Sequence, residues 1–308
     1  MIRLGLCCVF RCEPIKFRQV TLAYLNRLKK PYDHLCEVII ANVSALKQSL
    51  EYCAAHAIGC FRINSQLFPA FSHPDWSYAI ENLPHGGKIL ELLEECRTLR
   101  FEKGLRLTLH PDQFIVLNSP KKEVTKRAIS ELDYHALLSD FLEIDVINIH
   151  GGGVYGDKKR ALARFKAHYA FLSEQVKKRL TVENDDTSYT PLDLLPLCHE
   201  LGMPLVYDVH HHRCHQDSLP IQMATQQAVK TWNREPLFHI SSPLEGWEGP
   251  KPGRHHDFIS PSDFPSVWNN LTLTVEVEAK AKELAVSQLR DHLEAQGVCL
   301  WSCTAANS

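Results

Sequence analysis

Short apolar segments along this chain repeatedly end at a histidine or a carboxylate side chain. A β-strand that reaches an ionisable residue only at its C-terminal end presents that residue at one edge of a parallel sheet. Imidazoles and carboxylates gathered at such an edge are suitable ligands for divalent metal ions. Their recurrence here predicts an enzyme with several metal ions at one rim. The seven residues, six at strand ends and one in a later loop, are His110, His150, Glu183, Asp208, His239, His255 and Glu278.

The mixture of ligand types narrows both the metal and the reaction. Histidine together with carboxylate suits Mn²⁺, Zn²⁺ or Fe²⁺ better than Mg²⁺ or Ca²⁺. Adjacent ions can activate water as a nucleophile and stabilise the leaving oxygen of a phosphodiester. Asp208 and His211, in a D-x-x-H spacing, can converge on one ion or serve neighbouring ions. Catalysis by a nucleophilic side chain is disfavoured, because the sequence has no GxSxG motif and no cysteine with a histidine partner by motif.

Two neighbouring segments have a structural and a functional interpretation. His210, His212 and His215 crowd the loop of His211, and we expect them to support the ligands or to lie on the surface. The segment HGGGVYG, which begins at His150, is either a flexible turn or a main chain that a phosphate can approach closely. It lacks the lysine and the following Ser or Thr of a P-loop, so a nucleotide triphosphatase is disfavoured.

The elements that must position these residues alternate between short β-type runs and longer helical runs. Eight strand-then-helix units without a break in composition predict one closed (β/α)8 TIM barrel over residues 1–295, followed by a tail over 296–308. An open doubly wound sheet would place its site at a single switch point, whereas the candidate ligands come from six strands. The expected strands are 2–8, 60–64, 105–110, 145–150, 180–184, 204–209, 236–242 and 273–279. The expected helices are 34–57, 80–102, 121–142, 158–178, 190–201, 219–230 and 280–295.

Composition sets outer limits on function. The chain has 308 residues, of which 44% are hydrophobic and 23% charged, as in ordinary globular proteins. A formal net charge of −2 excludes binding to polyanions by bulk charge but leaves nucleic acid open, because bound cations would reverse the local sign. The 11 cysteines include no CxxC pair, and neither a signal peptide nor a membrane span is apparent. We therefore expect a reducing, cytoplasmic location and no membrane partner.

Around the candidate ligands, the chain resembles the UV damage endonuclease family along nearly its whole length. The matching segments are FSHP (71–74), LHPDQF (109–114), INIHGGGVYGDK (147–158), VENDD (182–186), DVHHH (208–212), HISSP (239–243), GRHHD (253–257) and VEAKAKE (277–283). The resemblance implies a xylose-isomerase-like TIM barrel with up to three divalent ions, usually taken to be manganese. It also implies incision of duplex DNA immediately 5′ of a cyclobutane dimer or 6-4 product, leaving 3′-hydroxyl and 5′-phosphate ends.

The resemblance further implies a division of the ligands among three ions. The first ion would be held by His110, His150 and Glu183. Glu183 would bridge to a second ion, which it would share with Asp208, His239 and Glu278. His211 and His255 would hold the third ion.

Other residues match positions that act on the DNA itself. His73 would contact the phosphate or the metal-bound water, and Lys280 would help to offset the phosphate charge. Gln113 and Phe114 match a probing pair that enters the base stack where the damaged bases are flipped out. Further candidates for DNA contact, all near expected rim loops, are Arg62, Lys158, Lys159, Arg160 and Arg254. For residues 158–160 a solvated helix start is an equally good interpretation.

The sequence departs from the family pattern at two places. Leu237 stands where family members commonly carry a lysine, reported as carboxylated, two residues before the strand-seven histidine. Leu6 follows Gly5 where the family tends to have an aromatic residue. We predict that catalysis survives these changes, but that metal preference, pH profile or lesion range differs.

Three alternative functions remain open. An abasic-site endonuclease of the endonuclease IV type would share the metals but recognise a missing base. A sugar isomerase or epimerase would use the same barrel with a small closed pocket and no DNA groove. A damage-binding protein with a degenerate metal site is disfavoured by the complete ligand set. The resemblance to the UV damage endonuclease family implies that the enzyme acts on double-stranded DNA as a monomer.

Overall fold

The computed structural model describes residues 1–76 and 78–303, and its centre is a closed ring of eight parallel strands. Each strand pairs with its neighbour in sequence, and β8 closes the ring by pairing with β1. The predicted TIM barrel is therefore confirmed. The strands are β1 Ile2–Cys7, β2 Cys60–Ile63, β3 Arg106–Leu109, β4 Val146–His150, β5 Leu180–Glu183, β6 Leu205–Asp208, β7 Leu237–Ile240 and β8 Leu273–Val277.

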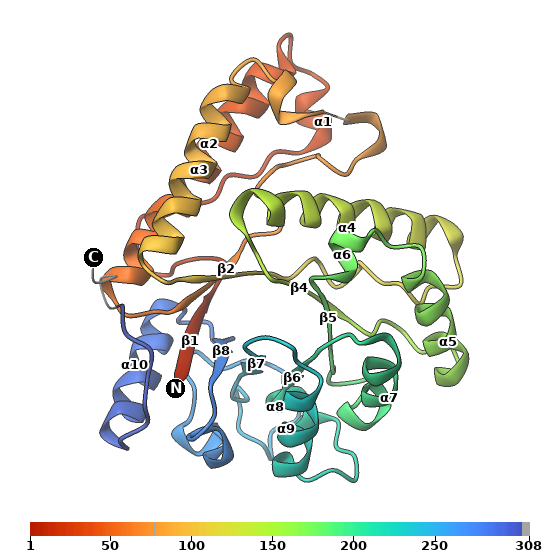
Figure 1. Cartoon of the computed structure of the whole chain (residues 1–308), viewed down its shortest axis with the longest axis vertical. Helices are drawn as coiled ribbons and strands as arrows, with labels where there is room; N and C mark the ends of the chain where they lie inside the picture. The colour runs from red at the N-terminus through yellow and green to blue at the C-terminus, as the bar shows by residue number, and fades with distance from the viewer. Residues whose placement is uncertain (77, 304–308) are drawn as a thin grey trace.

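Helices surround the ring and connect successive strands, as Figure 1 shows. Parallel strands in sequence order require such a crossover after each strand. The helices α2 and α3 pack against each other and extend beyond the strands. The longer helices are α2 Pro31–Ala55, α3 Gly86–Glu102, α4 Lys122–Leu142, α5 Lys158–Tyr169, α7 Pro191–Leu201, α9 Ile221–Lys230 and α10 Glu283–Ala295. The short ones are α1 Leu22–Leu25, α6 Glu174–Lys177 and α8 Val209–Cys214.

Three helices differ from the sequence-based expectation for identifiable reasons. The expected helix 158–178 is two helices, because Ser173 provides a new N-cap by accepting the Val176 amide hydrogen bond. The expected helix 80–102 becomes α-helical only at Gly86, since Pro84 cannot occupy a helix interior. The segment after β6, expected as a loop, forms α8, whose first turn is capped by the Asp208 side chain.

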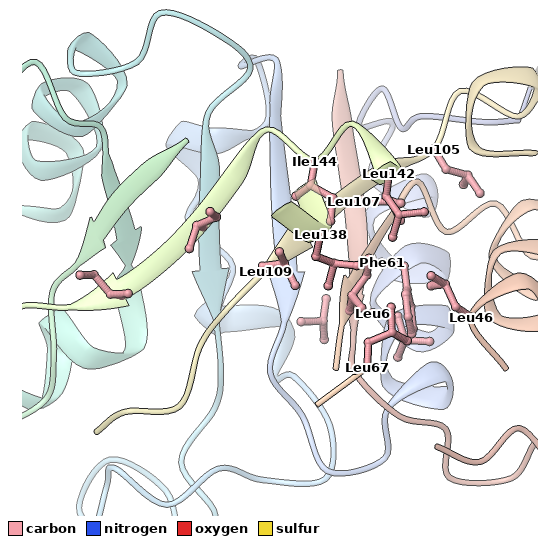
Figure 2. Close-up of a cluster of buried hydrophobic side chains, with 14 of the residues drawn as sticks. Leu6, Leu46, Phe61, Leu67, Leu105, Leu107, Leu109, Leu138, Leu142 and Ile144 are labelled. Atoms are coloured by element: carbon pink, nitrogen blue, oxygen red, sulfur yellow. The ribbon is translucent and has the colours of Figure 1, made fainter. Parts of the chain in front are cut away.

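Outward-facing side chains of the strands form the core between the barrel and the helices. Figure 2 shows part of this layer, in which Leu6, Phe61 and Leu107 of the strands lie near Leu138 and Leu142 of α4. Each of these five is fully buried. Burial of one such side chain stabilises the fold by about 1.5–3 kcal/mol. Leu6 therefore serves the core outside the ring and not a lesion pocket.

Inside the ring, the end nearest the strand N-termini contains a small apolar cluster. Leu237 is 1% exposed and packs there with Val146 and Val206, with Trp232 at the edge. The side chain of a lysine at position 237 would lie among these apolar neighbours. Around the cluster, Arg106 is 6% exposed and pairs with Asp145 at 2.7 Å.

The C-terminal segment packs on the barrel as far as it is described. The Ile2 amide donates to the Cys299 carbonyl and the Trp301 amide to the Ile2 carbonyl, both at 2.8 Å. Trp301 is 8% exposed. Residues 304–308 of the expected tail lie outside the described residues. In the part of the chain that the structure describes, no helix is long and apolar enough to cross a membrane.

Candidate metal centre

The predicted ligands meet at the C-terminal rim of the barrel, where six strands end. Every second side chain of a strand points into the ring, so the last inward-facing residues of neighbouring strands converge. His150, Glu183 and Asp208 are the final residues of β4, β5 and β6. His239 lies within β7, and His110 and Glu278 directly follow β3 and β8.

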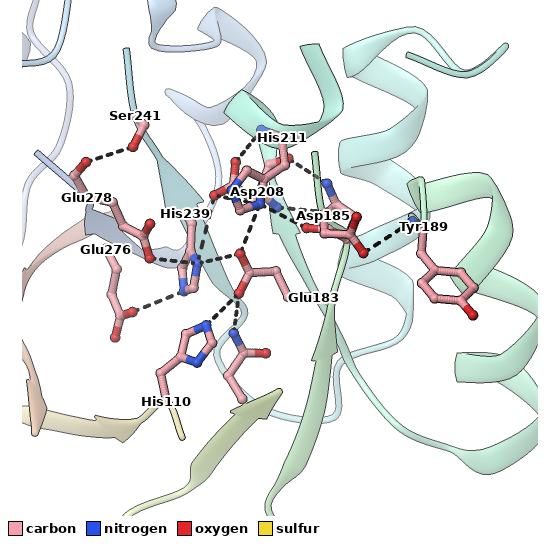
Figure 3. A network of polar contacts seen from close by, with 12 residues as sticks. His110, Glu183, Asp185, Tyr189, Asp208, His211, His239, Ser241, Glu276 and Glu278 are labelled. Carbon is pink, nitrogen blue, oxygen red and sulfur yellow. Dashed lines mark hydrogen bonds and ion pairs between the residues drawn. The ribbon is translucent and has the colours of Figure 1, made fainter. Parts of the chain in front are cut away.

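Glu183 lies at the centre of this group and contacts three imidazoles. Its carboxylate is 3.0 Å from His110 Nε2, 3.3 Å from His211 Nδ1 and 3.2 Å from His239 Nδ1. Figure 3 shows these contacts radiating from Glu183, which is itself 1% exposed. This carboxylate therefore joins candidate ligands that come from β7, from the residue after β3 and from α8.

The candidate ligands fall into three overlapping groups. Within each group the ligand atoms all lie within 4.8 Å of one another, close enough to hold a metal ion. Glu183 and Asp208 each belong to two groups, so the groups form a chain of linked sites. The groups are His110–His150–Glu183, Glu183–Asp208–His211, and Asp208–His239–Glu278.

Several buried atoms at the rim have no hydrogen-bond partner among the described residues. They include His150 Nδ1, Asp208 Oδ2 and His239 Nδ1. A buried polar atom without a partner costs about 1–3 kcal/mol, so such atoms demand an explanation. Here they belong to the same residues that form the three groups. The residues present therefore fit divalent cations, and these buried clusters could bind metal ions.

The charge balance at the rim favours cations. One buried guanidinium, that of Arg62, pairs with Glu276 and Glu278, while the carboxylates of Glu183 and Asp208 lie in the same buried group. Burial alone would lower the pKa of His239, but the charge of Glu183 raises it to about 10. Burial likewise opposes a charged His211, yet Asp208 and Glu183 raise its pKa well above the ordinary value. Without metal ions, protons bound to these two imidazoles offset the negative charge of the carboxylates. Bound metal ions would offset the same charge.

The two residues expected at a third ion, His211 and His255, have ring centroids 6.3 Å apart, but only one of them belongs to a ligand group. His211 joins Glu183 and Asp208, whereas His255 belongs to none of the three groups of described residues. His255 lies 3.8 Å from Glu278 and its side chain is 27% exposed. Beside it lies His210, fully buried, with a ring centroid 5.2 Å from that of His255 and both ring nitrogens without a partner among the described residues.

A set of polar residues behind the ligands was not singled out by the sequence analysis. Asn148 donates to Glu183 Oε2 at 2.5 Å, and Thr108 donates to Glu276. Glu276 contacts His239 Nε2 at 3.0 Å. Strand alternation could have revealed them, because each lies two residues before a predicted ligand and so faces the same way. Asn184, which directly follows Glu183, donates to the Asp208 carbonyl at 2.8 Å.

An open cavity of about 840 Å³ leads from the surface to the ligands. Gln113 and Phe114 line it, and Phe114 is 73% exposed although it is a large apolar residue. Tyr155 also lines this cavity, is 49% exposed and has a left-handed φ of 49°. Exposed aromatic side chains beside a polar site are typical of surfaces that stack against nucleobases.

Three other predicted site residues lie around the rim. Lys280 is exposed and lines a neighbouring cavity together with Arg254, His255 and Glu278. Arg254 is exposed and 3.4 Å from Glu245. His73, whose side chain is 38% exposed, accepts the Asp75 amide hydrogen bond in the β2–α3 connection and is not among the described residues that line either cavity.

The basic residues expected at the DNA divide into buried and exposed ones. Arg62 is 7% exposed and lies inside the barrel, paired with Glu276 and Glu278. Lys158 is 2.6 Å from Asp193. Lys159 and Arg160 are exposed at the start of α5. Contact of these residues with DNA stays a prediction, but their side chains differ in how exposed they are to solvent.

Comparison with known proteins identifies the family of this chain. The model of the family described as UV-endonuclease UvdE matches residues 2–304. The chain belongs to this family. It is therefore an enzyme, a hydrolytic endonuclease that acts on DNA.

UV-endonuclease relatives cover most of this chain. A UV DNA damage endonuclease of Deinococcus radiodurans is 35% identical over 301 residues, covering 94% of each chain. One of Bacillus cereus (strain G9842) is 33% identical over 294 residues, covering 92% of this chain and 90% of the relative. The crystal structure of SacUVDE matches with a TM-score of 0.87 at 28% identity over 97% of this chain and all of the other. Endonuclease IV from Thermus thermophilus, with a TM-score of 0.59 at 15% identity over 95% of this chain and 98% of the other, shares the fold.

Proposed function

We propose that this UV-endonuclease incises duplex DNA immediately 5′ of a UV photolesion, using divalent ions held at the barrel rim. The observation that carries the proposal is the three linked groups of buried ligands at the floor of an open cavity. Names of the matched relatives point to UV-damaged DNA as the substrate. Cyclobutane dimers and 6-4 products are the proposed lesions, and the enzyme is proposed to act as a monomer.

The proposed ions are up to three Mn²⁺, with Zn²⁺ or Fe²⁺ as alternatives. His110, His150 and Glu183 would hold one, and Glu183, Asp208, His239 and Glu278 a second. His211 and His255 are proposed for a third, with Asp208 and Glu183 close to His211. Such ions supply a water nucleophile at neutral pH and stabilise the leaving oxygen of the phosphodiester.

In the reaction, the water oxygen forms a bond to phosphorus and the bond from phosphorus to the 3′ oxygen breaks. The 3′ oxygen leaves with a proton, so the products are a 3′-hydroxyl and a 5′-phosphate. Lys280, exposed beside Glu278, is proposed to offset phosphate charge. His73 is proposed to contact the phosphate when DNA is bound.

Recognition of the lesion is proposed to depend on the exposed pair at the cavity mouth. Gln113 and Phe114 would enter the base stack at the lesion. Unstacking costs less where the bases are already damaged, so the insertion itself selects lesions. Arg62, Lys158, Lys159, Arg160 and Arg254 are the proposed basic contacts, of which Lys159 and Arg160 are the most accessible.

The proposal is tested by nicking of labelled duplexes that carry one cyclobutane dimer, one abasic site or no lesion. Addition of Mn²⁺ to chelator-treated protein should produce a nick 5′ of the dimer, and EDTA should abolish it. Cleavage confined to the abasic duplex would replace the proposal with an abasic-site activity. Undiminished cleavage in EDTA would overturn the metal requirement.

A matched pair of variants separates the metal ligands from their surroundings. His211→Asn removes a group that faces Glu183, whereas His212→Asn changes the next residue, which faces Tyr207 and Asp217 instead. The first variant should lose incision and the second should keep it. Equal loss in both, with unchanged melting temperatures, would contradict the assignment.

A further inference from the structure

Glu276 is a buried carboxylate below the metal ligands to which the proposed reaction assigns no role. It lies in β8, is 1% exposed and belongs to none of the ligand groups formed by the described residues. In the strand register it is directly opposite His239 of β7 and Gly5 of β1. A Cβ atom at Gly5 would lie 3.1 Å from Glu276 Cγ, so the glycine leaves room for this side chain.

The Glu276 carboxylate is held by several donors. Arg62 Nε donates to Oε2 at 2.5 Å, and Thr108 Oγ1 donates to Oε1. These donors, one of them a guanidinium, fix the carboxylate in one position within the barrel.

Two groups compete for Nε2 of His239. Glu276 Oε2 lies 3.0 Å from this nitrogen and Arg62 Nη2 lies 2.9 Å from it. Arginine can only donate, so a bond from Arg62 requires a bare Nε2 and leaves the proton on Nδ1. Carboxylate can only accept, so a bond to Glu276 requires the proton on Nε2 and leaves Nδ1 with a free lone pair.

A metal ion binds to an imidazole nitrogen through a free lone pair, so the tautomer with the proton on Nε2 is the one that can bind metal through Nδ1. Nδ1 of His239 lies 3.2 Å from Glu183 and 3.4 Å from Glu278, and it has no hydrogen-bond partner among the described residues. It therefore faces the carboxylates proposed to share an ion with it. Figure 3 shows Glu276 in contact with one nitrogen of the His239 ring, and Glu183 and Glu278 in contact with the other.

We infer that Glu276 is a positioning residue for the metal centre, which selects the metal-binding tautomer of His239 by accepting from Nε2 and pairs with the Arg62 guanidinium that competes for the same nitrogen. The inference rests on the proposed metal site and adds a residue that determines its affinity. Carboxylate partners of metal-bound histidines fix the ring orientation and the basicity of the ligand in this way. In this protein the partner comes from the neighbouring strand.

The test is Mn²⁺ affinity of the chelator-treated full-length protein, measured by calorimetry without DNA. Glu276→Gln keeps the size of the side chain but removes the charge, and should weaken Mn²⁺ binding by about 10- to 100-fold. Glu235→Gln is the matched control, because Glu235 is a partly buried carboxylate that pairs with Arg3 at 3.0 Å near the opposite end of the barrel. Its affinity should equal that of the wild type.

A double variant tests the competition directly. Arg62→Met with Glu276→Gln removes the competing donor as well as the carboxylate, so it should bind Mn²⁺ more tightly than Glu276→Gln alone, in which the buried guanidinium keeps only Glu278 as a carboxylate partner. If Glu276→Gln does not fold, Arg62→Met is compared with the double variant, and the double variant should bind more weakly.

Each contrary outcome has a definite meaning. Wild-type affinity in Glu276→Gln, or an equal loss in Glu235→Gln, would overturn the inference, and so would a double variant that equals Arg62→Met. A wild-type protein that binds no Mn²⁺, Zn²⁺ or Fe²⁺ would instead overturn the proposed metal centre itself.

Discussion

The two ends of the barrel interior both contain buried charges, but they balance them differently. Near the strand N-termini, three arginines face two carboxylates, so the positive groups are in slight excess; the arginines are Arg3, Arg106 and Arg234, and the carboxylates are Glu235 and Asp145. Arg106 also donates to Thr274 at 3.0 Å. Arg3, Arg106, Glu235 and Asp145 all have hydrogen-bond partners, whereas Arg234 Nε has none among the described residues.

At the C-terminal rim the imbalance has the opposite sign and is larger. Four carboxylates are gathered there with one guanidinium, that of Arg62, which pairs with two of them, and ligand atoms of His150, Asp208 and His239 lack partners among the described residues. A buried ion network that is fully paired can be explained by the fold alone. One with excess negative charge and unpaired ligand atoms is explained by cations that bind there. This contrast separates the structural end of the barrel from the functional end.

The largest expected effect is at the centre of the rim. Glu183→Gln removes the charge shared by two ligand groups, and incision of a dimer-containing duplex should fall by about 10³-fold or more, since a metal ion contributes several kcal/mol to such a reaction. Glu235→Gln at the other end should leave incision within a few-fold. Rates measured at saturating Mn²⁺ check this, and comparable losses in both variants would remove the contrast between the two ends.

The next largest effect is on the free energy of unfolding, and it comes from changes to Leu237 in the apolar cluster. Leu237→Lys places an unpaired ammonium beside Val146 and Val206 and should lower the free energy of unfolding by about 3–5 kcal/mol. Leu237→Met, which conserves volume, should cost less than about 1.5 kcal/mol. Chemical denaturation of both variants provides the measurement. A lysine variant as stable as the methionine variant would show that this end accepts the charge that family members commonly carry.

A smaller effect is expected at the cavity mouth. Phe114→Ala should leave Mn²⁺ affinity unchanged and weaken binding to dimer-containing DNA by about 1–3 kcal/mol, the usual loss of one base-stacking contact. Phe171→Ala is the control, because Phe171 is equally exposed, at 73%, but follows α5 outside the cavity. Fluorescence anisotropy with labelled duplexes measures both variants. Similar losses in the two would refute a specific role for Phe114.

The smallest effect is on the salt dependence of DNA binding. Lys159→Gln and Arg160→Gln should each reduce the slope of log affinity against log salt by about 0.9 if the residue contacts one phosphate. Binding isotherms at several salt concentrations measure this slope. An unchanged slope in both variants would assign these residues to a solvated helix start.

The rim ligands were predictable because each comes at or beside the end of a short apolar strand. Closed parallel topology then brings these ends together, so the barrel and the linked ligand groups followed from local patterns. Glu276 was accessible to the same logic, since it lies two residues before Glu278 on one strand. The role of Glu276 could not be predicted from the sequence, because its contact with His239 depends on the register of β7 and β8.

Other features depend on long-range packing that sequence patterns do not encode. Arg62 was expected near a rim loop, but strand alternation and the Glu276 carboxylate place it inside the barrel. His73 and His255 lie in long connections, whose courses have no periodic signal. The position of His255 relative to His211 therefore came only from the structure.

The central claim is that the unbalanced rim is a metal centre, and equilibrium binding of Mn²⁺ to the chelator-treated protein tests it most directly. We predict saturable binding of two to three ions per chain, lost from Glu183→Gln and retained by Glu235→Gln. Absence of saturable binding in the wild type, or identical binding by the two variants, would contradict the account.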